Sequence, residues 1–152
     1  MINNPTDVLT VREAALEDSD RIAQLSGQLG YLAASPEIRQ RLAAVQPRES
    51  DLILVAQLPG EGVVGWAHAC LVQHLMTPAY VELAGLVVDE HQRSAGIGAA
   101  LLSEVERWGR KKGCKEIWVR CNIIRERAHR FYLRSGYQLK KSQHVFVKCL
   151  GG

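Results

Sequence analysis

The stretch VVDEHQRSAGIG, residues 87–98, decides how this chain is interpreted. It continues an apolar run typical of a strand covered on both faces, residues 80–88, and leads into residues 96–112, whose apolar side chains recur at helical spacing. The free N–H groups and the dipole at such a helix start favour a bound phosphate or pyrophosphate. Gly96 and Gly98 have no side chains to keep an anion from the backbone. Glycines also begin many helices in α/β proteins, so the stretch alone is also consistent with a purely structural role.

Two other phosphate-binding loops are excluded by the sequence. No GxxxxGK[ST] stretch occurs, which excludes a P-loop. No GxGxxG follows the first predicted strand, as a dinucleotide-binding fold requires. Residues 87–98 therefore belong to neither of these loop classes.

The rest of the sequence alternates between strand and helix patterns. Strands are expected over residues 9–13, 52–58, 63–75, 80–88, 116–120, 137–139 and 144–149. Helices are expected before Gly30, from Ser35 to about Val45, over 96–112, and before Gly136. No repeat or linker divides the chain, so we expect one domain over residues 1–152. This order predicts a mixed α/β sheet with helices on its faces.

Composition and charge narrow the class of protein. Of the 152 residues, 47% are hydrophobic and 23% are charged, as in soluble globular domains. No apolar run approaches the roughly 18 residues of a membrane helix, so no membrane partner is expected. The formal net charge of +3 permits an anionic ligand but does not indicate nucleic acid. The cysteines form no CxxC pair and the polar start carries no export signal, so we expect a cytoplasmic protein with reduced thiols.

Other kinds of site find little support in the sequence. The histidines are too scattered for a metal site, and no metal is expected. No histidine or acid is placed by the sequence to activate Cys121 as a nucleophile. The basic run from Arg107 to Lys115 complements a helix dipole and lacks the interleaved aromatic residues of a nucleic-acid site.

Two motifs in the expected order relate the chain to a known family. Residues 93–98 match the signature Q/R-x-x-G-x-G/A, with Arg at the first position. Asn122, the AHRFY stretch at 128–132 and the GY pair at 136–137 match a later motif, Asn followed by A-x-x-F-Y-x-x-x-G-Y/F. The sequence resembles the GCN5-related N-acetyltransferases over residues 9–150, nearly the whole chain.

The resemblance implies a mixed, mostly antiparallel sheet of six to seven strands with helices on both faces. It also implies acetyl-coenzyme A (acetyl-CoA) as co-substrate, with the main chain of Leu86, Val87 and Val88 pairing with the pantetheine arm. Asn122 is expected to hold the pantetheine or an ordered water. The residues implied to face the pyrophosphate are Arg93, Ser94, Ala95, Gly96, Ile97, Gly98 and Ala99.

Catalytic roles implied by the resemblance fall on two residues. Tyr132 is expected to return a proton to the departing coenzyme A thiolate and to contact the cofactor. Glu82, on the strand before the signature, is expected to accept a proton from the acceptor amine. From periodicity alone, Tyr132 also fits a buried helix face and Glu82 a solvated strand position. A main-chain N–H near Val87 is expected to polarise the thioester carbonyl, and no metal is required.

The acceptor is expected to be a primary amine of a small molecule, resembling an aminoglycoside, a polyamine or an amino acid. It would attack acetyl-CoA directly in a ternary complex. Residues that could face it by position are Tyr31, Glu37, His68, Gln73 and Tyr80. Relatives are often dimers, and residues 137–150 are the expected contact between the two copies. The alternatives are a non-catalytic acyl-CoA-binding sensor or partner domain and a protein or peptide N-acetyltransferase.

Overall fold

The computed structural model describes residues 9–93, 95–121 and 123–151. The strands are β1 (Thr10–Glu13), β2 (Asp51–Leu58), β3 (Gly62–Val72), β4 (Tyr80–Val88) and β5 (Ile117–Val119). The α-helices are α1 (Ser19–Gly27), α2 (Ser35–Val45), α3 (Ile97–Lys111) and α4 (Glu126–Arg134). Two short 3-10 helices, η2 (Leu16–Asp18) and η3 (Glu90–Gln92), precede α1 and α3. The chain forms two compact units: residues through Val119 hold the sheet, and those from Arg120 hold α4.

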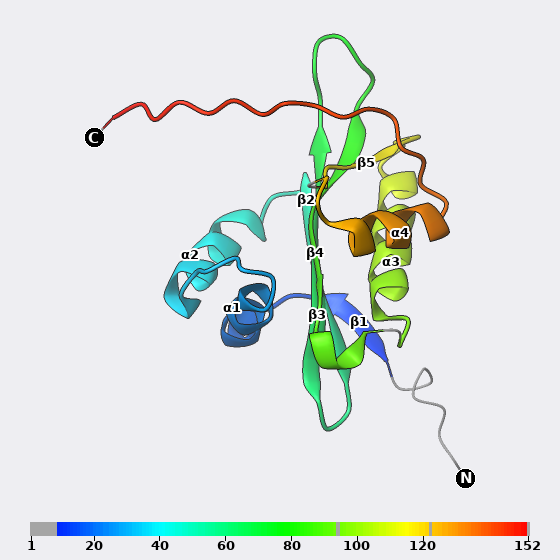
Figure 1. The fold of residues 1–152 in the computed structure, drawn as a ribbon. Helices are drawn as coiled ribbons and strands as arrows, with labels where there is room; N and C mark the ends of the chain where they lie inside the picture. The colour runs from blue at the N-terminus through cyan, green and yellow to red at the C-terminus, as the bar shows by residue number, and fades with distance from the viewer. Residues whose placement is uncertain (1–8, 94, 122, 152) are drawn as a thin grey trace. The chain divides into compact units, whose positions relative to one another are not determined.

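The sheet of the first unit has the strand order β1-β2-β3-β4-β5 (Figure 1). Neighbouring strands are antiparallel except β4 and β5, which are parallel. This confirms the mixed, mostly antiparallel sheet. Hairpin connections join β2, β3 and β4, whereas the chain crosses over through α3 before it forms β5, as a parallel pair requires.

Helices cover both faces of the sheet, as expected (Figure 1). Gly65 lets α3 approach one face, since a Cβ on it would lie 3.1 Å from Ile97 Cγ2. Its neighbour Trp66 points to the opposite face, where the indole Nε1 donates to Ser26 Oγ of α1 at 3.2 Å. The core on that face is built from residues of α1, α2, three strands and the segment after β1, namely Ala14, Ile22, Leu25, Leu42, Val55, Val63 and Val87. The sheet is therefore the middle layer of three.

The two strands predicted at the C-terminus are not formed. Tyr137–Leu139 and His144–Cys149 lack regular secondary structure, so the described residues form five strands rather than six or seven. Phe146 is 92% exposed, and its neighbours Val145 and Val147 are exposed as well. Alternating apolar residues favour a strand only where a partner strand supplies hydrogen bonds and a surface to pack on, and this segment has neither in the described structure.

One boundary also differs from the prediction. The strand expected to reach Leu75 ends at Val72, and the Leu75 side chain is fully exposed. The Gln73 amide donates to the carbonyls of His74 (2.8 Å) and Thr77 (2.9 Å), which closes the turn early. Leu75 therefore belongs to the turn and not to the strand, although it is apolar.

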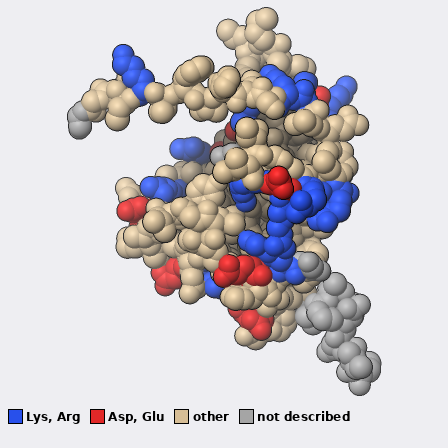
Figure 2. Space-filling view, viewed as in Figure 1, with Lys and Arg blue, Asp and Glu red and all other residues tan. Residues whose placement is uncertain are grey.

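Surface charge is mixed. Figure 2 shows lysine and arginine side chains together with aspartate and glutamate side chains on the viewed face, in keeping with the formal net charge of +3. Among the described residues, no helix combines the length and apolarity needed to cross a membrane.

Trp66 lies directly over Gly85, so we predict that Gly85→Ala destabilises the sheet. A Cβ at Gly85 would be 2.7 Å from Cη2 of the indole, and the ring is held by its bond to Ser26. Overpacking of this kind costs about 1–3 kcal/mol, to be measured by denaturant unfolding. Gly27→Ala is the matched control, because nothing lies within 4 Å of a Cβ there. Equal stabilities for the two variants would contradict the prediction.

Candidate functional site

The loop after β4 is fixed by the buried carboxylate of Asp89. This side chain is 8% exposed and forms an ion pair of 2.7 Å with Arg21 Nη2 on α1. Gln28 Nε2 donates to its other oxygen at 3.2 Å, as does the His91 amide at 3.1 Å. Arg21 also donates from Nε to the carbonyl of Val63 on β3 at 2.8 Å. One carboxylate thus ties together α1, the end of β4 and the start of the glycine loop.

The surroundings of Asp89 favour its charged form. Burial alone would raise the pKa of Asp89. Hydrogen bonds from the His91 amide, Gln28 and Arg21, together with the charge of Arg21, outweigh that effect, so the pKa is lowered. Gln28 makes a second contact, accepting from the Glu90 amide at 2.9 Å. The loop therefore begins at a charged and fully bonded anchor.

The loop ends at Gly96, which caps the N-terminus of α3. Gly96 has a left-handed backbone with φ of 77°, which favours glycine, and open space lies where its Cβ would be. The first intrahelical hydrogen bond runs from the Ala100 amide to the Gly96 carbonyl, at 3.0 Å. The amides of the first helical turn, residues 97–99, have no intrahelical acceptor, as at any helix start. Ser94 lies outside the described residues, and Arg93 is half-buried.

β4 has an open edge in front of this loop. Its described pairing with β5 covers only Val81 to Leu83. Leu83 pairs with Ala69 of β3 while Gly85 pairs with His68, so Ala84 is the extra residue of a β-bulge. Beyond the bulge, residues 85–88 pair with β3 but with no strand on the β5 side among the described residues.

The residues predicted to pair with pantetheine lie on this open edge. Val87 is buried in the core beneath α1, and Leu86 and Val88 are half-buried. Their side chains therefore fill the core while every second main-chain group on the open side is available to a ligand. An extended arm laid along residues 86–88 would run toward the amides at the start of α3. These features fit a thioester cofactor with a pyrophosphate.

Glu82 lies in a row of side chains that crosses the α1/α2 face of the sheet. Directly paired positions place Asp51 of β2 beside Cys70 of β3, Cys70 beside Glu82 of β4, and Glu82 beside Trp118 of β5. Burial raises the pKa of the Cys70 thiol, and the charges of Glu82 and Asp51 raise it further. The thiol stays protonated between two carboxylates. The predicted base thus stands in this row of side chains, three residues before the open edge begins at Gly85.

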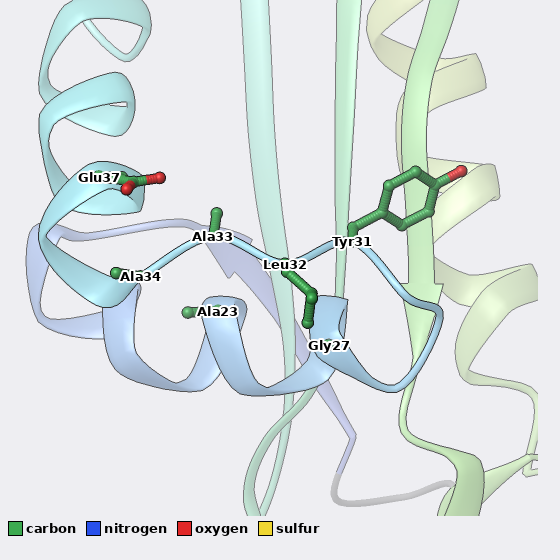
Figure 3. Close-up of a pocket in the computed structure, with 7 residues that line it drawn as sticks. All are labelled: Ala23, Gly27, Tyr31, Leu32, Ala33, Ala34 and Glu37. Carbon is green, nitrogen blue, oxygen red and sulfur yellow. The ribbon is translucent and has the colours of Figure 1, made fainter.

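Two of the predicted acceptor residues line one hollow. Tyr31 and Glu37 border a space of about 280 Å³ between α1, the following loop and the first turn of α2 (Figure 3). The other lining residues are Ala23, Gly27, Leu32, Ala33 and Ala34. Figure 3 shows Leu32 turned toward Gly27, while the Glu37 carboxylate and the Tyr31 ring extend away from the α1 backbone. The hollow has small apolar walls and one carboxylate.

The structure does not gather the other acceptor candidates into that hollow. His68 lies on β3, where its Nε2 contacts Asp51 Oδ2 at 2.8 Å. Gln73 holds the turn after β3. Tyr80 is buried, with its ring 5.3 Å from that of Trp118 and 5.8 Å from that of His74.

Tyr132, the predicted general acid, belongs to the second unit. It lies on α4 with its ring against those of Phe131 and Tyr137, at centroid distances of 5.2 and 5.8 Å. Burial raises the pKa of Tyr132 to about 12, Cys121 adds to the shift and Arg125 opposes it. The phenol therefore keeps its proton throughout the neutral range. Asn122, predicted to hold the pantetheine, lies outside the described residues.

The model of the acetyltransferase (GNAT) family matches residues 17–137 of this sequence. The chain belongs to this family. It is 34% identical over 149 residues to the aminoalkylphosphonate N-acetyltransferase of Salmonella typhimurium, with 94% of this chain and 92% of that protein covered. This GNAT protein is an acetyl-CoA-dependent N-acetyltransferase.

Solved structures share the GNAT fold of this chain. The aminoglycoside 6'-N-acetyltransferase AAC(6')-Ih of Acinetobacter baumannii has a TM-score of 0.81 at 18% identity, covering 94% of this chain and 99% of that one. AAC(6')-Iy, in complex with the bisubstrate analog CoA-S-monomethyl-acetylneamine, also has a TM-score of 0.81, at 19% identity, with 93% and 98% covered. The two resemblances support the fold alone.

Sequence reasoning missed the residues that anchor the loop between β4 and α3 of this GNAT domain. Asp89 stood inside the quoted stretch, but its partners Arg21 and Gln28 are 68 and 61 residues away. An aspartate directly after a buried strand was the available signal, because a buried carboxylate needs a partner. Among the described residues, no group of three or more His, Cys, Asp or Glu side chains is placed to hold a metal ion.

We predict that Arg21→Ala lowers the free energy of unfolding by about 2 kcal/mol, because it leaves the buried Asp89 carboxylate without its cation. The pKa of Asp89 lies below its ordinary value of 3.8, so this contribution is present above about pH 4 and is lost as the pH falls through the lower folded pKa. Urea unfolding at pH 7 and at pH 3 tests both points.

Arg107→Ala is the matched control for this prediction. Arg107 pairs with Glu104 only on the exposed surface of α3, at 3.6 Å. Its removal is expected to change stability by less than about 0.5 kcal/mol. A gap between the two variants that stays constant from pH 7 to pH 3 would contradict the role assigned to Asp89.

Proposed function

We propose that this protein moves the acetyl group of acetyl-CoA to the primary amine of a small molecule, by direct attack in a ternary complex. The observation that carries the proposal is the open edge of β4, which leads through the Asp89-anchored loop to the glycine-capped start of α3. The edge supplies main-chain partners for the pantetheine, and the helix start supplies amides and a dipole for the pyrophosphate. The residues for the pyrophosphate are those from Arg93 to Ala99.

The acceptor class is proposed from the relatives and the hollow together. One relative is named for aminoalkylphosphonates, and structural neighbours are aminoglycoside N-acetyltransferases. The hollow between α1 and α2 is of small-molecule size, and its Glu37 carboxylate suits an ammonium or hydroxyl group. Tyr31 and Glu37 are therefore proposed as part of the acceptor wall.

The chemistry is divided between two proposed catalytic residues. Glu82 takes a proton from the acceptor, because an ammonium has no lone pair with which to attack. The nitrogen then bonds to the acetyl carbon, the C–S bond breaks, and its electron pair leaves on sulfur. Tyr132, which retains its proton at neutral pH, gives that proton to the thiolate. A main-chain N–H near Val87 is proposed to stabilise the oxygen of the carbonyl during attack.

We also propose that the chain acts as one cytoplasmic N-acetyltransferase domain that pairs with a second copy. All four cysteines are free, which suits a reducing compartment. Residues 137–150 expose Leu139, Val145, Phe146, Val147 and Leu150, and exposed apolar side chains on an extended segment favour a partner surface. Light scattering of the chain with and without residues 137–150 tests the dimer.

Calorimetry of acetyl-CoA binding to wild type, Gly96→Ala and Gly96→Glu tests the cofactor site. Alanine at this left-handed position is expected to cost about 1 kcal/mol of stability and to weaken binding slightly. Glutamate adds a negative charge beside the pyrophosphate and is expected to abolish binding. Release of free thiol would then be measured with (2-aminoethyl)phosphonate, neamine and spermidine. Absence of acetyl-CoA binding by wild type would overturn the proposed function.

Removal of the Tyr132 hydroxyl distinguishes between two functions, an N-acetyltransferase and a non-catalytic acyl-CoA sensor. Tyr132→Phe is expected to lower kcat by about 10²-fold and to leave acetyl-CoA affinity unchanged, because the hydroxyl acts on the leaving thiolate. With a pKa of about 12, Tyr132 should cause no fall in the wild-type rate below about pH 11. Phe131→Leu is the control for packing on α4. Unchanged turnover in Tyr132→Phe would remove Tyr132 from the mechanism.

A further inference from the structure

Asp51 and His68 form a side-chain pair to which no catalytic role has been assigned so far, although His68 is one of the residues expected by position to face the acceptor. The pair joins β2 to β3, with 2.8 Å between Asp51 Oδ2 and His68 Nε2. The Asp51 side chain is 9% exposed and the imidazole 27%. An ionised carboxylate only accepts hydrogen bonds, so the contact places a proton on Nε2 and, in the neutral ring, leaves the lone pair on Nδ1. A buried acid thus orients a partly accessible imidazole.

The pair stands on the α1/α2 face of the sheet, on the two strands that precede β4 in the strand order, whereas the open edge of β4 is on its other side, toward β5. His68 lies opposite Ile53, whose side chain packs against the core under α1 and α2. Across the other strand boundary His68 pairs with Gly85, the first residue of β4 after the bulge. Directly paired residues of antiparallel strands have their Cα atoms about 4.5–5.5 Å apart. The imidazole is therefore one strand away from the main chain proposed to carry the thioester arm.

We propose that His68, oriented by Asp51, is a second base of the acetyl transfer. The inference rests on the proposed function, because it concerns the same reaction. An acceptor ammonium has three N–H bonds and the product amide has one, so two protons must leave the nitrogen. One of the two replaces the proton that Tyr132 gives to the coenzyme A sulfur, and the other is released to water. Glu82 and His68 each accept one of the two.

The charges around His68 suit this role. Asp51 faces it from β2, Glu82 stands on β4, and the thiol of Cys70 lies between them on β3. The Asp51 carboxylate, 2.8 Å from Nε2, can accept the N–H of that nitrogen before and after the ring takes up a proton. The pKa of the Cys70 thiol is raised by burial and by both acids, so the thiol adds no further negative charge. Asp51 is a positioning residue, since it acts through the ring.

Turnover of His68→Ala and His68→Gln tests the base. With whichever of (2-aminoethyl)phosphonate, neamine or spermidine wild type acetylates, kcat is expected to fall about 10²-fold, with KM and acetyl-CoA affinity within about twofold of wild type. Added imidazoles should restore turnover of His68→Ala in order of their basicity, which a structural role would not produce. Arg107→Ala, on the exposed surface of α3, is the control. Wild-type kcat in both variants, or a loss confined to KM, would overturn the proposal.

The orientation of the ring is tested without any acceptor. Nitrogen-15 NMR of the histidine rings is expected to show His68 with its proton on Nε2 and a bare Nδ1. In Asp51→Asn the amide can donate to Nε2, so the proton should move to Nδ1 and kcat should fall in the same direction as in His68→Ala. A ring protonated on both nitrogens at the assay pH, or on Nδ1 in wild type, would overturn the proposal. Either result leaves acetyl-CoA binding, and with it the proposed function, standing.

Discussion

The negative charge of Asp89 lies where β4 ends, and the geometry of the loop between β4 and α3 depends on how that charge is neutralised. A carboxylate with so little exposure is stable only with partners, and Arg21, Gln28 and the His91 amide supply them. Because Arg21 and Gln28 belong to α1 and its C-terminal cap, the same bonds fix α1 against the sheet. Helix α1 and the loop between β4 and α3 thus share one anchor.

β4 combines two roles that usually conflict. A strand whose side chains are buried usually has its main chain paired on both sides, because unpaired backbone groups are costly. Here the bulge at Ala84 and the short pairing with β5 release one side of residues 85–88, while Val87 remains in the core. Side chains and main chain of one segment can therefore serve stability and binding separately. The cost of the open edge is offset when an extended ligand pairs with it.

The α1/α2 face of the sheet carries the polar chemistry of the first unit. Asp51, His68, Cys70 and Glu82 come from three neighbouring strands, and the sheet register brings them into two adjacent rows. Trp66 and Gly85 border these rows, and the close approach of the indole leaves no room for a side chain there. The opposite face, under α3, is packed with apolar residues such as Leu101 and Val105. The α1/α2 face thus carries both a hydrophobic core and these polar side chains, whereas apolar residues pack the face under α3.

Several helices and strands were determined by residues close to them in the sequence. The glycine-capped helix α3, the strand β4 and the helices α1 and α2 follow from periodicity, caps and turn residues within a few positions, and the motif over residues 93–98 pointed to the cofactor. Only the tertiary structure decided which strands find partners and which charges meet. The segment 144–149 has a strand pattern but forms no strand among the described residues. Asp89 meets Arg21 across 68 residues of sequence, and Asp51 meets His68 across 17. Strand pairing and charge neutralisation depend on distances in space, which the packing of the whole unit sets.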